Sequence, residues 1–363
     1  MNSASARNAV IILAVVAAFA AAYWLRGILT PLALAVFLLI MIDGFARTLE
    51  RRLPQVSRKT ATPLAIVLSL LVLSLSLYVV ADNMTSFVNQ LNVYVPRLNE
   101  RLAAVAAGLG LGEEVPTIQQ LIGRLNPGQV VATVANGLQN FASDFIFVLI
   151  YLGFLLATRR SFARKVRALF PDPDQRREAT EVVEGVRRGV EKYLWVQTVT
   201  GAMIAVASYA LMAIMGEENA WFWAFFIFIT GYVPIIGAAV GTIAPGLFAF
   251  VQYDTLWQPL VILIGLQAIN FFVGNVIYPR MQGESLNLDP VAVLLALAFF
   301  GALWGIPGAF LSTPLTVTAM IILAQFKGTR WIAVLMSNNG NPAGADRARE
   351  REAEKGTYNP AKP

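Results

Sequence analysis

The chain has 363 residues, of which 57% are hydrophobic and 14% are charged, and its mean hydropathy is +0.61. Soluble globular domains carry about 25% charged residues, so this sequence lacks the groups needed to cover a water-facing surface. It contains no histidine and no cysteine, which excludes disulfides, thiolate nucleophiles, Cys/His zinc sites and histidine general bases. We therefore expect an integral membrane protein that is not an enzyme and that uses no cofactor or metal.

Eight segments contain no Asp, Glu, Lys or Arg and are candidates for crossing a bilayer, whose core takes about 20 helical residues. In chain order they are Asn8–Leu25, Gly27–Ile42, Thr60–Ala81, Phe145–Thr158, Tyr193–Gly216, Asn219–Tyr253, Thr255–Pro279 and Pro290–Phe326. The first could also be a secretory signal peptide, but only Arg26 separates it from the second. We expect a retained helical hairpin, within a group of N-terminal transmembrane helices over residues 1–81.

The distribution of Lys and Arg predicts the orientation. Five of these residues lie in 43–59, ten in 159–192 and seven from 327 onward, against three in 82–144 and none in 216–219. Cytoplasmic loops are enriched in them, so both termini and the basic part of 144–192, which follows one transmembrane helix, are expected in the cytoplasm. The net charge of +6 reflects this flanking pattern and does not indicate a nucleic-acid partner.

Residues 82–143 have apolar side chains three and four positions apart, as in amphipathic helices. We expect a small extracytoplasmic helical module there, with apolar faces that pack on each other or on neighbouring subunits. The tail 327–363 is rich in Asn, Gly, Pro and mixed charges towards its end, which predicts a cytoplasmic and largely disordered segment.

Two of the eight segments are too long for one span. Asn219–Tyr253 and Pro290–Phe326 would form helices of roughly 52 and 55 Å, against a bilayer core of about 30 Å. Each contains a proline, which interrupts helical hydrogen bonding, and a glycine near its middle: Pro234 with Gly237, and Pro307 with Gly308. The pattern predicts two helical hairpins, and both re-entrant hairpins and pairs of complete spans satisfy it.

Residues 193–326 are predicted to form a core of two inverted units, each a spanning helix followed by a proline-broken hairpin. The two spanning helices, Tyr193–Met215 and Thr255–Tyr278, cross in opposite directions. Inverted repeats with discontinuous helices form the midplane substrate sites of many secondary transporters. The expected fold class is an all-α polytopic membrane protein with about eight hydrophobic segments and an inverted repeat.

Both spanning helices carry polar and small residues along one face. With the hairpin tips, they make the candidate substrate path Gln197, Thr200, Pro234, Gly237, Gln267, Asn270, Asn275, Pro307 and Gly308. The same composition is typical of close helix packing, so the sequence fits both a polar solute path and a dry packing surface. Ionisable residues are scarce in the spans. Glu284 and Asp289, at predicted span ends, are candidates for ion coupling, but the position of Asp289 favours its alternative role as the N-cap of the second hairpin.

Three blocks resemble the signature blocks of the autoinducer-2 exporter family, the PerM-like permeases: Gly231-Tyr-Val-Pro-Ile-Ile-Gly237, Asn275-Val-Ile-Tyr-Pro279-Arg-Met-Gln-Gly283 and Gly305-Ile-Pro-Gly308-Ala-Phe-Leu-Ser-Thr-Pro314-Leu. The resemblance implies a homo-oligomer in the bacterial inner membrane that exports the quorum-sensing furanone signal or, as in some members, exchanges sodium for protons. The sequence departs from the family pattern at Met41-Ile-Asp43-Gly44, where we expect an Asn-Pro-like turn. It departs again at Pro307, which lies inside the usual Gly-x-x-Gly pair.

We therefore expect a transporter that moves a small polar solute, similar to autoinducer-2, outward across the lipid bilayer by alternating access. Neutral amides and hydroxyls suit a polyhydroxylated neutral solute better than a bare cation. The alternatives are a sodium/proton antiporter of the same family, a channel, and an oligomeric membrane scaffold that transports nothing.

Overall fold

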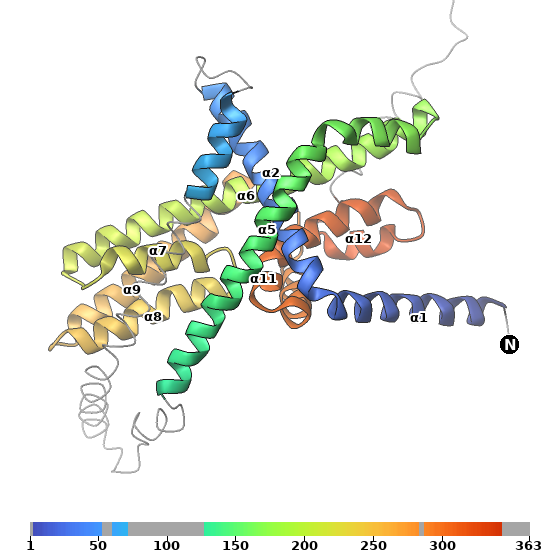
Figure 1. Cartoon of the computed structure of the whole chain (residues 1–363). Helices are drawn as coiled ribbons and strands as arrows, with labels where there is room; N and C mark the ends of the chain where they lie inside the picture. The colour runs from blue at the N-terminus through green and yellow to red at the C-terminus, as the bar shows by residue number, and fades with distance from the viewer. Residues whose placement is uncertain (1–2, 53–59, 72–126, 283–286, 343–363) are drawn as a thin grey trace, which may run out of the picture. The chain divides into compact units, whose positions relative to one another are not determined.

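The computed structural model describes residues 3–52, 60–71, 127–282 and 287–342, which are almost entirely helical (Figure 1). Within these ranges there is no β-strand, only an isolated bridge between Leu288 and Ser337. Among the described residues, four helical stretches are long and apolar enough to cross a membrane: Arg26–Glu50, Pro173–Met215, Trp257–Met281 and Pro290–Gln325. The prediction of a helical membrane protein is thus confirmed, whereas most of the expected module at 82–143, Glu284 and the end of the tail lie outside the described residues.

The helices follow the order of the apolar segments. They are α1 (Ser3–Trp24), α2 (Arg26–Arg52), a helix over Thr60–Leu71, α5 (Pro127–Leu169), α6 (Pro173–Met215), α7 (Ala220–Thr230), α8 (Ile236–Gln252), α9 (Trp257–Phe272), the π-helical turn η1 (Val273–Ile277), α10 (Tyr278–Gln282), α11 (Pro290–Gln325) and α12 (Arg330–Met336). Prolines account for the break between α5 and α6. The residue before a proline avoids the helical region, and Pro173 occupies the first turn of α6, where no backbone donor is needed.

The chain divides into two compact units. The first unit comprises residues 1–44, 144–195 and 282–363, and the second comprises residues 45–143 and 196–281. Each unit contains one of the two segments that the sequence predicts to be hairpins.

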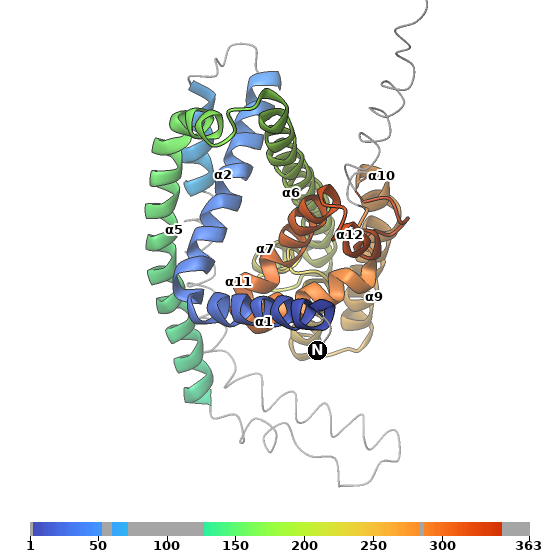
Figure 2. The same cartoon turned by 90° about the vertical axis from the view of Figure 1, so that its right-hand side faces the viewer.

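The core of the first unit lies between α2, α6 and α11. Its buried members are Phe37, Val190, Tyr193, Leu194, Leu311, Val317 and Ile321. Gly189 lets α6 approach α11 closely, because a Cβ atom there would lie 3.0 Å from side-chain atoms of both Val317 and Ile321. Figure 2 shows α12 beside α11, to which it packs.

The core of the second unit is formed by the end of α6 with α7, α8 and α9, and α8 lies beside both α7 and α9 (Figure 1). Its buried members are Met212, Ala220, Phe222, Trp223, Ala224, Ile227, Phe248, Ala249, Ile262 and Leu266. Edge-to-face and tilted ring contacts join Trp223 to Phe222, Phe226 and Phe248. This aromatic packing fixes α7 against α8 over the half of the hairpin that is remote from its tip.

Candidate functional site

The α7–α8 hairpin reverses direction in a strained turn. Pro234 accepts a hydrogen bond from the backbone N–H of Ile236 at 2.6 Å, around Ile235 with φ 63° and ψ −60°. This is the γ-turn with positive φ, which is rare and strained, and a β-branched residue seldom adopts it. Next to it, a Cβ atom on Gly237 would lie 1.7 Å from the carbonyl oxygen of Thr230. The tip is therefore a backbone-on-backbone contact that requires glycine at position 237.

Two side chains of α6 hold this tip. The amide nitrogen of Gln197 donates to the carbonyl oxygen of Gly231 at 2.7 Å, and the hydroxyls of Thr198 and Tyr232 are 2.8 Å apart in a hydrogen bond. Gly231 ends α7, so its carbonyl belongs to the groups that a helix leaves without an intrahelical partner. The structure therefore brings Gln197 together with the predicted tip residues.

Asn270 connects α9 to α8. Its amide nitrogen donates to the hydroxyl of Thr242 and to the carbonyl of Leu266, both at 3.1 Å. Gln267, one turn earlier in α9, is exposed. Thr200 is buried, and its hydroxyl donates at 2.7 Å to a carbonyl oxygen of its own helix. The polar stripes thus contain packed members, Thr200 and Asn270, and an exposed one, Gln267.

A wider helical turn follows Asn270. η1 is a five-residue π-helical turn within an otherwise α-helical span, and such turns are frequent at functional sites. Asn275 lies in this turn, is exposed, and donates to the carbonyl of Phe271 at 2.9 Å. Gly274 beside it has open space, since a Cβ atom there would meet nothing within 4 Å. The predicted path residues of α9 therefore continue into an irregular, open stretch of the helix.

The second predicted hairpin is α11. Gly305 has the non-helical angles φ 68° and ψ −144°, and a Cβ atom on Gly308 would lie 1.9 Å from the carbonyl oxygen of Phe300. Phe300 and Gly308 would be far apart in a straight helix, so the chain turns back between them. Pro307, which is half-buried, lies in this turn. The non-helical residue of this turn is Gly305, two positions before the predicted Pro307.

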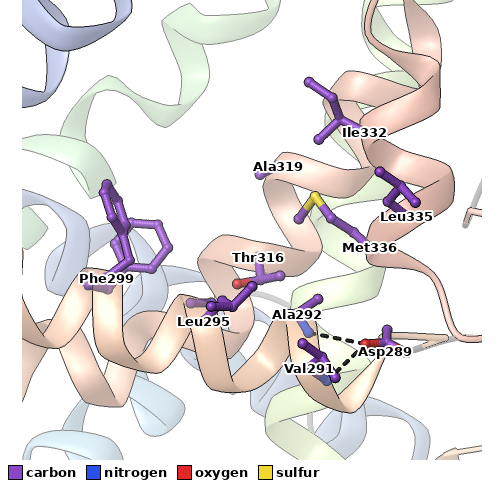
Figure 3. Close-up of a pocket in the computed structure, with 12 residues that line it drawn as sticks. Asp289, Val291, Ala292, Leu295, Phe299, Thr316, Ala319, Ile332, Leu335 and Met336 are labelled. Carbon is purple, nitrogen blue, oxygen red and sulfur yellow. Dashed lines mark hydrogen bonds between the residues drawn. The ribbon is translucent and has the colours of Figure 1, made fainter.

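The two arms of α11 and α12 enclose an open, mainly apolar cavity of about 540 Å³ (Figure 3). It is lined by Leu295 and Phe299 from the first arm, Thr316 from the second and Met336 from α12. Asp289 lies at one end, where its carboxylate accepts hydrogen bonds from the backbone N–H groups of Val291 and Ala292 at 2.8 and 3.2 Å. Asp289 is thus the N-cap of α11, one of the two roles that the sequence left open for it.

Two charged features were not predicted from the sequence. Asp43 of α2 is almost fully buried and forms an ion pair with Arg159 of α5 at 2.8 Å. Glu217, in the loop between α6 and α7, is 5% exposed, and its burial raises its pKa to about 8. A sequence signal for Glu217 existed, because residues 193–279 contain only Glu217, Glu218 and Asp254 as charged residues. Among the described residues, no group of three His, Cys, Asp or Glu could hold a metal ion.

The sequence matches the model of the family described as AI-2E family transporter over residues 12–328, so the chain belongs to the AI-2E transporter family. It is 25% identical over 320 residues to the AI-2 transport protein TqsA of Escherichia coli K12, covering 86% of this chain and 90% of that protein. It is 27% identical over 322 residues to a putative transport protein of Haemophilus influenzae, with coverage of 86% and 90%. It is 22% identical over 337 residues to the putative permease PerM of Escherichia coli K12, with coverage of 85% and 90%.

Proposed function

We propose that this multi-pass membrane protein exports a small polar solute, similar to autoinducer-2, from the bacterial cytoplasm by alternating access. The observation that carries the proposal is the pair of hairpin tips, one in each unit, in which a glycine lies against a backbone carbonyl. Interrupted helices leave backbone groups unpaired, and at membrane depth these persist only where protein or a water-filled cavity satisfies them. Such discontinuous helices are the usual substrate-binding elements of secondary transporters.

The proposed solute path retains the candidate residues of the hairpin tips and of the polar helix faces. It comprises Gln197, Thr200, Pro234, Gly237, Gln267, Asn270, Asn275, Pro307 and Gly308. Gln267 and Asn275 offer exposed amides to a solute. Gln197 binds the first tip directly, so a movement of that tip would release its amide for a new partner. These neutral groups suit a polyhydroxylated solute.

The proposal includes the finer architecture expected from the sequence. It has about eight hydrophobic segments, cytoplasmic termini and an inverted repeat in residues 193–326. Residues 1–81 form the N-terminal helices, 82–143 the extracytoplasmic module, 144–192 a transmembrane helix with the basic cytoplasmic segment, and 327–363 the cytoplasmic tail. The protein would form homo-oligomers in the inner membrane, and the solute would take part in quorum sensing.

Flux into proteoliposomes of the purified protein tests this proposal. Autoinducer-2 is offered with and without a proton gradient, for the wild type, for Asn270→Leu and for Gln325→Leu, which alters an exposed amide at the end of α11. We expect saturable movement that Asn270→Leu abolishes and Gln325→Leu retains. Folded protein that moves no signal molecule contradicts the proposal.

The same vesicles test the other activity implied for the family. A pH dye reports proton movement driven by sodium, and such movement without signal transport would favour an antiporter with ion coupling at Glu284 or Asp289. If neither signal transport nor proton movement is detected, the result would favour the membrane scaffold that transports nothing. Labelling of single cysteines at positions 197 and 270 separates that alternative further, because the chain has no native cysteine and a dry packing surface would not react.

A further inference from the structure

We propose that Glu217 is a proton-binding site at the base of the α7–α8 hairpin, which holds its proton while the loop Gly216–Asn219 is closed and releases it to water when the loop opens. The proposal concerns a site distinct from the solute path and does not depend on which solute is carried.

The backbone places the Glu217 side chain at a position that normally takes an apolar residue. The N–H of Gly216 donates to the carbonyl of Ala213 at 3.1 Å, and the N–H of Glu217 donates to the carbonyl of Met212 at 2.9 Å, with Gly216 at φ 80°. This pair of bonds is the Schellman motif that ends a helix at a left-handed glycine. The residue after that glycine usually packs against the last turns of its helix, and here that residue is a glutamate.

Nothing among the described residues compensates for the burial of the Glu217 carboxyl group. Glu217 is 5% exposed, and neither of its oxygens has a hydrogen-bond partner in the part of the chain that the structure describes. Moving a charged carboxylate out of water costs far more than moving the neutral acid, unless a cation or several donors compensate. Burial accordingly raises the pKa of Glu217 from its ordinary value of 4.5 to about 8.

The surrounding charges favour the same protonation state. In the part of the chain that the structure describes, Tyr253 lies close enough to interact with the charges of Glu217 and Glu218, and neither Glu218 nor Tyr253 is a cation. The second-unit part of α6, and α7, α8 and α9, contain no Lys or Arg. The neutral acid is therefore the form that fits the closed loop.

The loop is closed by two residues at the end of α8. The amide of Gln252 donates to the carbonyl of Gly216 at 3.0 Å and accepts from the N–H of Glu218 at 2.8 Å, so it bonds to the backbone on both sides of Glu217. The hydroxyl of Tyr253 donates to the carbonyl of Met215 at 3.0 Å. Opening the loop must break these bonds. Deprotonation of Glu217 favours opening, because the charged carboxylate is costly to keep buried. Proton binding is thereby linked to the position of α8 relative to α6.

Infrared difference spectra of the full-length protein test the site directly, between about pH 6 and about pH 9.5, a range in which ordinary carboxyls are already ionised. Glu217→Gln is compared with Glu218→Gln, which alters the exposed neighbouring carboxyl. We expect the wild type and Glu218→Gln to lose the C=O stretch of one protonated carboxylic acid on alkalinisation, and Glu217→Gln to show no such loss. An unchanged loss in Glu217→Gln, or none in the wild type, overturns the proposal.

A second variant tests the link to the loop and keeps Glu217 itself intact. Tyr253→Phe removes one hydroxyl that holds the loop, so water reaches the carboxyl more easily and the pH midpoint of the same infrared band should fall. An unchanged midpoint contradicts the link between proton release and loop opening. Both measurements are made without transport, so failure of the solute-export proposal leaves them interpretable, and their failure leaves that proposal standing.

Discussion

Substitution of Gly237 by alanine should destabilise the protein and disable the first hairpin. The new Cβ atom would lie 1.7 Å from the carbonyl oxygen and 2.5 Å from the carbonyl carbon of Thr230, whereas non-bonded atoms of this kind prefer separations of about 3.5 Å or more. The obstructing atoms are backbone, so a side-chain rotation cannot relieve the overlap. The two arms of the hairpin must then separate by roughly 2 Å at the tip, and overpacking of this kind costs about 1–3 kcal/mol or more.

The matched control is Gly153→Ala in α5, where the added Cβ atom would meet nothing within 4 Å. Alanine is favoured over glycine in a helix by about 0.5–1 kcal/mol, so this variant should be slightly more stable than the wild type. We expect the thermal unfolding midpoint in detergent to fall for Gly237→Ala and to rise slightly for Gly153→Ala. Gly308→Ala should resemble Gly237→Ala, since its Cβ atom would lie 1.9 Å from the carbonyl of Phe300. Wild-type midpoints and flux in both tip variants would refute the close-approach argument.

Four further predictions concern single residues. The folded state binds the Glu217 proton more tightly than the unfolded chain, so wild-type stability should fall as the pH rises from 4.5 to about 8. At about 1.36 kcal/mol per pH unit the loss is at most about 5 kcal/mol, and thermal midpoints of Glu217→Gln measured against pH should be nearly flat; a slope as steep as that of the wild type would contradict this. Asp43→Asn should lower the free energy of unfolding by about 1–3 kcal/mol, because it leaves Arg159 without its ion-pair partner. A double-mutant cycle of Asp43 and Arg159, measured by thermal unfolding, should give a coupling energy of similar size. Asp289→Ala should lose about 0.5–2 kcal/mol of capping energy, and Asp289→Asn should retain both stability and transport unless the residue couples ions. Ile235→Gly should raise the thermal midpoint by relieving about 1–3 kcal/mol of backbone strain, and a lowered midpoint would show that the exposed isoleucine is needed for packing.

Much of this fold could be predicted from the sequence, because hydropathy and proline positions act locally. The break before Pro173 follows from the residue type, because the residue before a proline avoids the helical region. The turn in α11 does not follow from proline alone: its non-helical residue is Gly305, and the helices continue through Pro31, Pro245 and Pro314. Helix lengths were less predictable. α2 continues to Arg52 and α5 continues to Leu169, well into the basic segments, since Arg and Lys are good helix formers and no proline or glycine stops them.

The candidate site was predictable in its residue types and not in its partners. The amide of Gln197 could be recognised as polar within an apolar span, but its bond to the carbonyl of Gly231 joins residues 34 positions apart. The burial of Glu217 was not predicted either, because it also depends on contacts between residues far apart in the sequence. A glutamate in a short loop is expected to be exposed, and only the return of α8, with Gln252, closes that loop over it.

The two hairpin tips reach a similar backbone arrangement from different sequences. Each tip has one residue at positive φ, Ile235 in the first and Gly305 in the second, and a glycine two or three positions later that touches a backbone carbonyl. The second tip takes its positive φ at a glycine without strain, whereas the first takes it at an isoleucine that the bond from Gln197 to the end of α7 helps to hold in place. A tip held in this way resists displacement, because Gln197 belongs to α6 and any movement of the tip relative to that helix must break the bond. The loop that contains Glu217 joins the same hairpin to α6 at its base, so α6 holds the first hairpin at both ends.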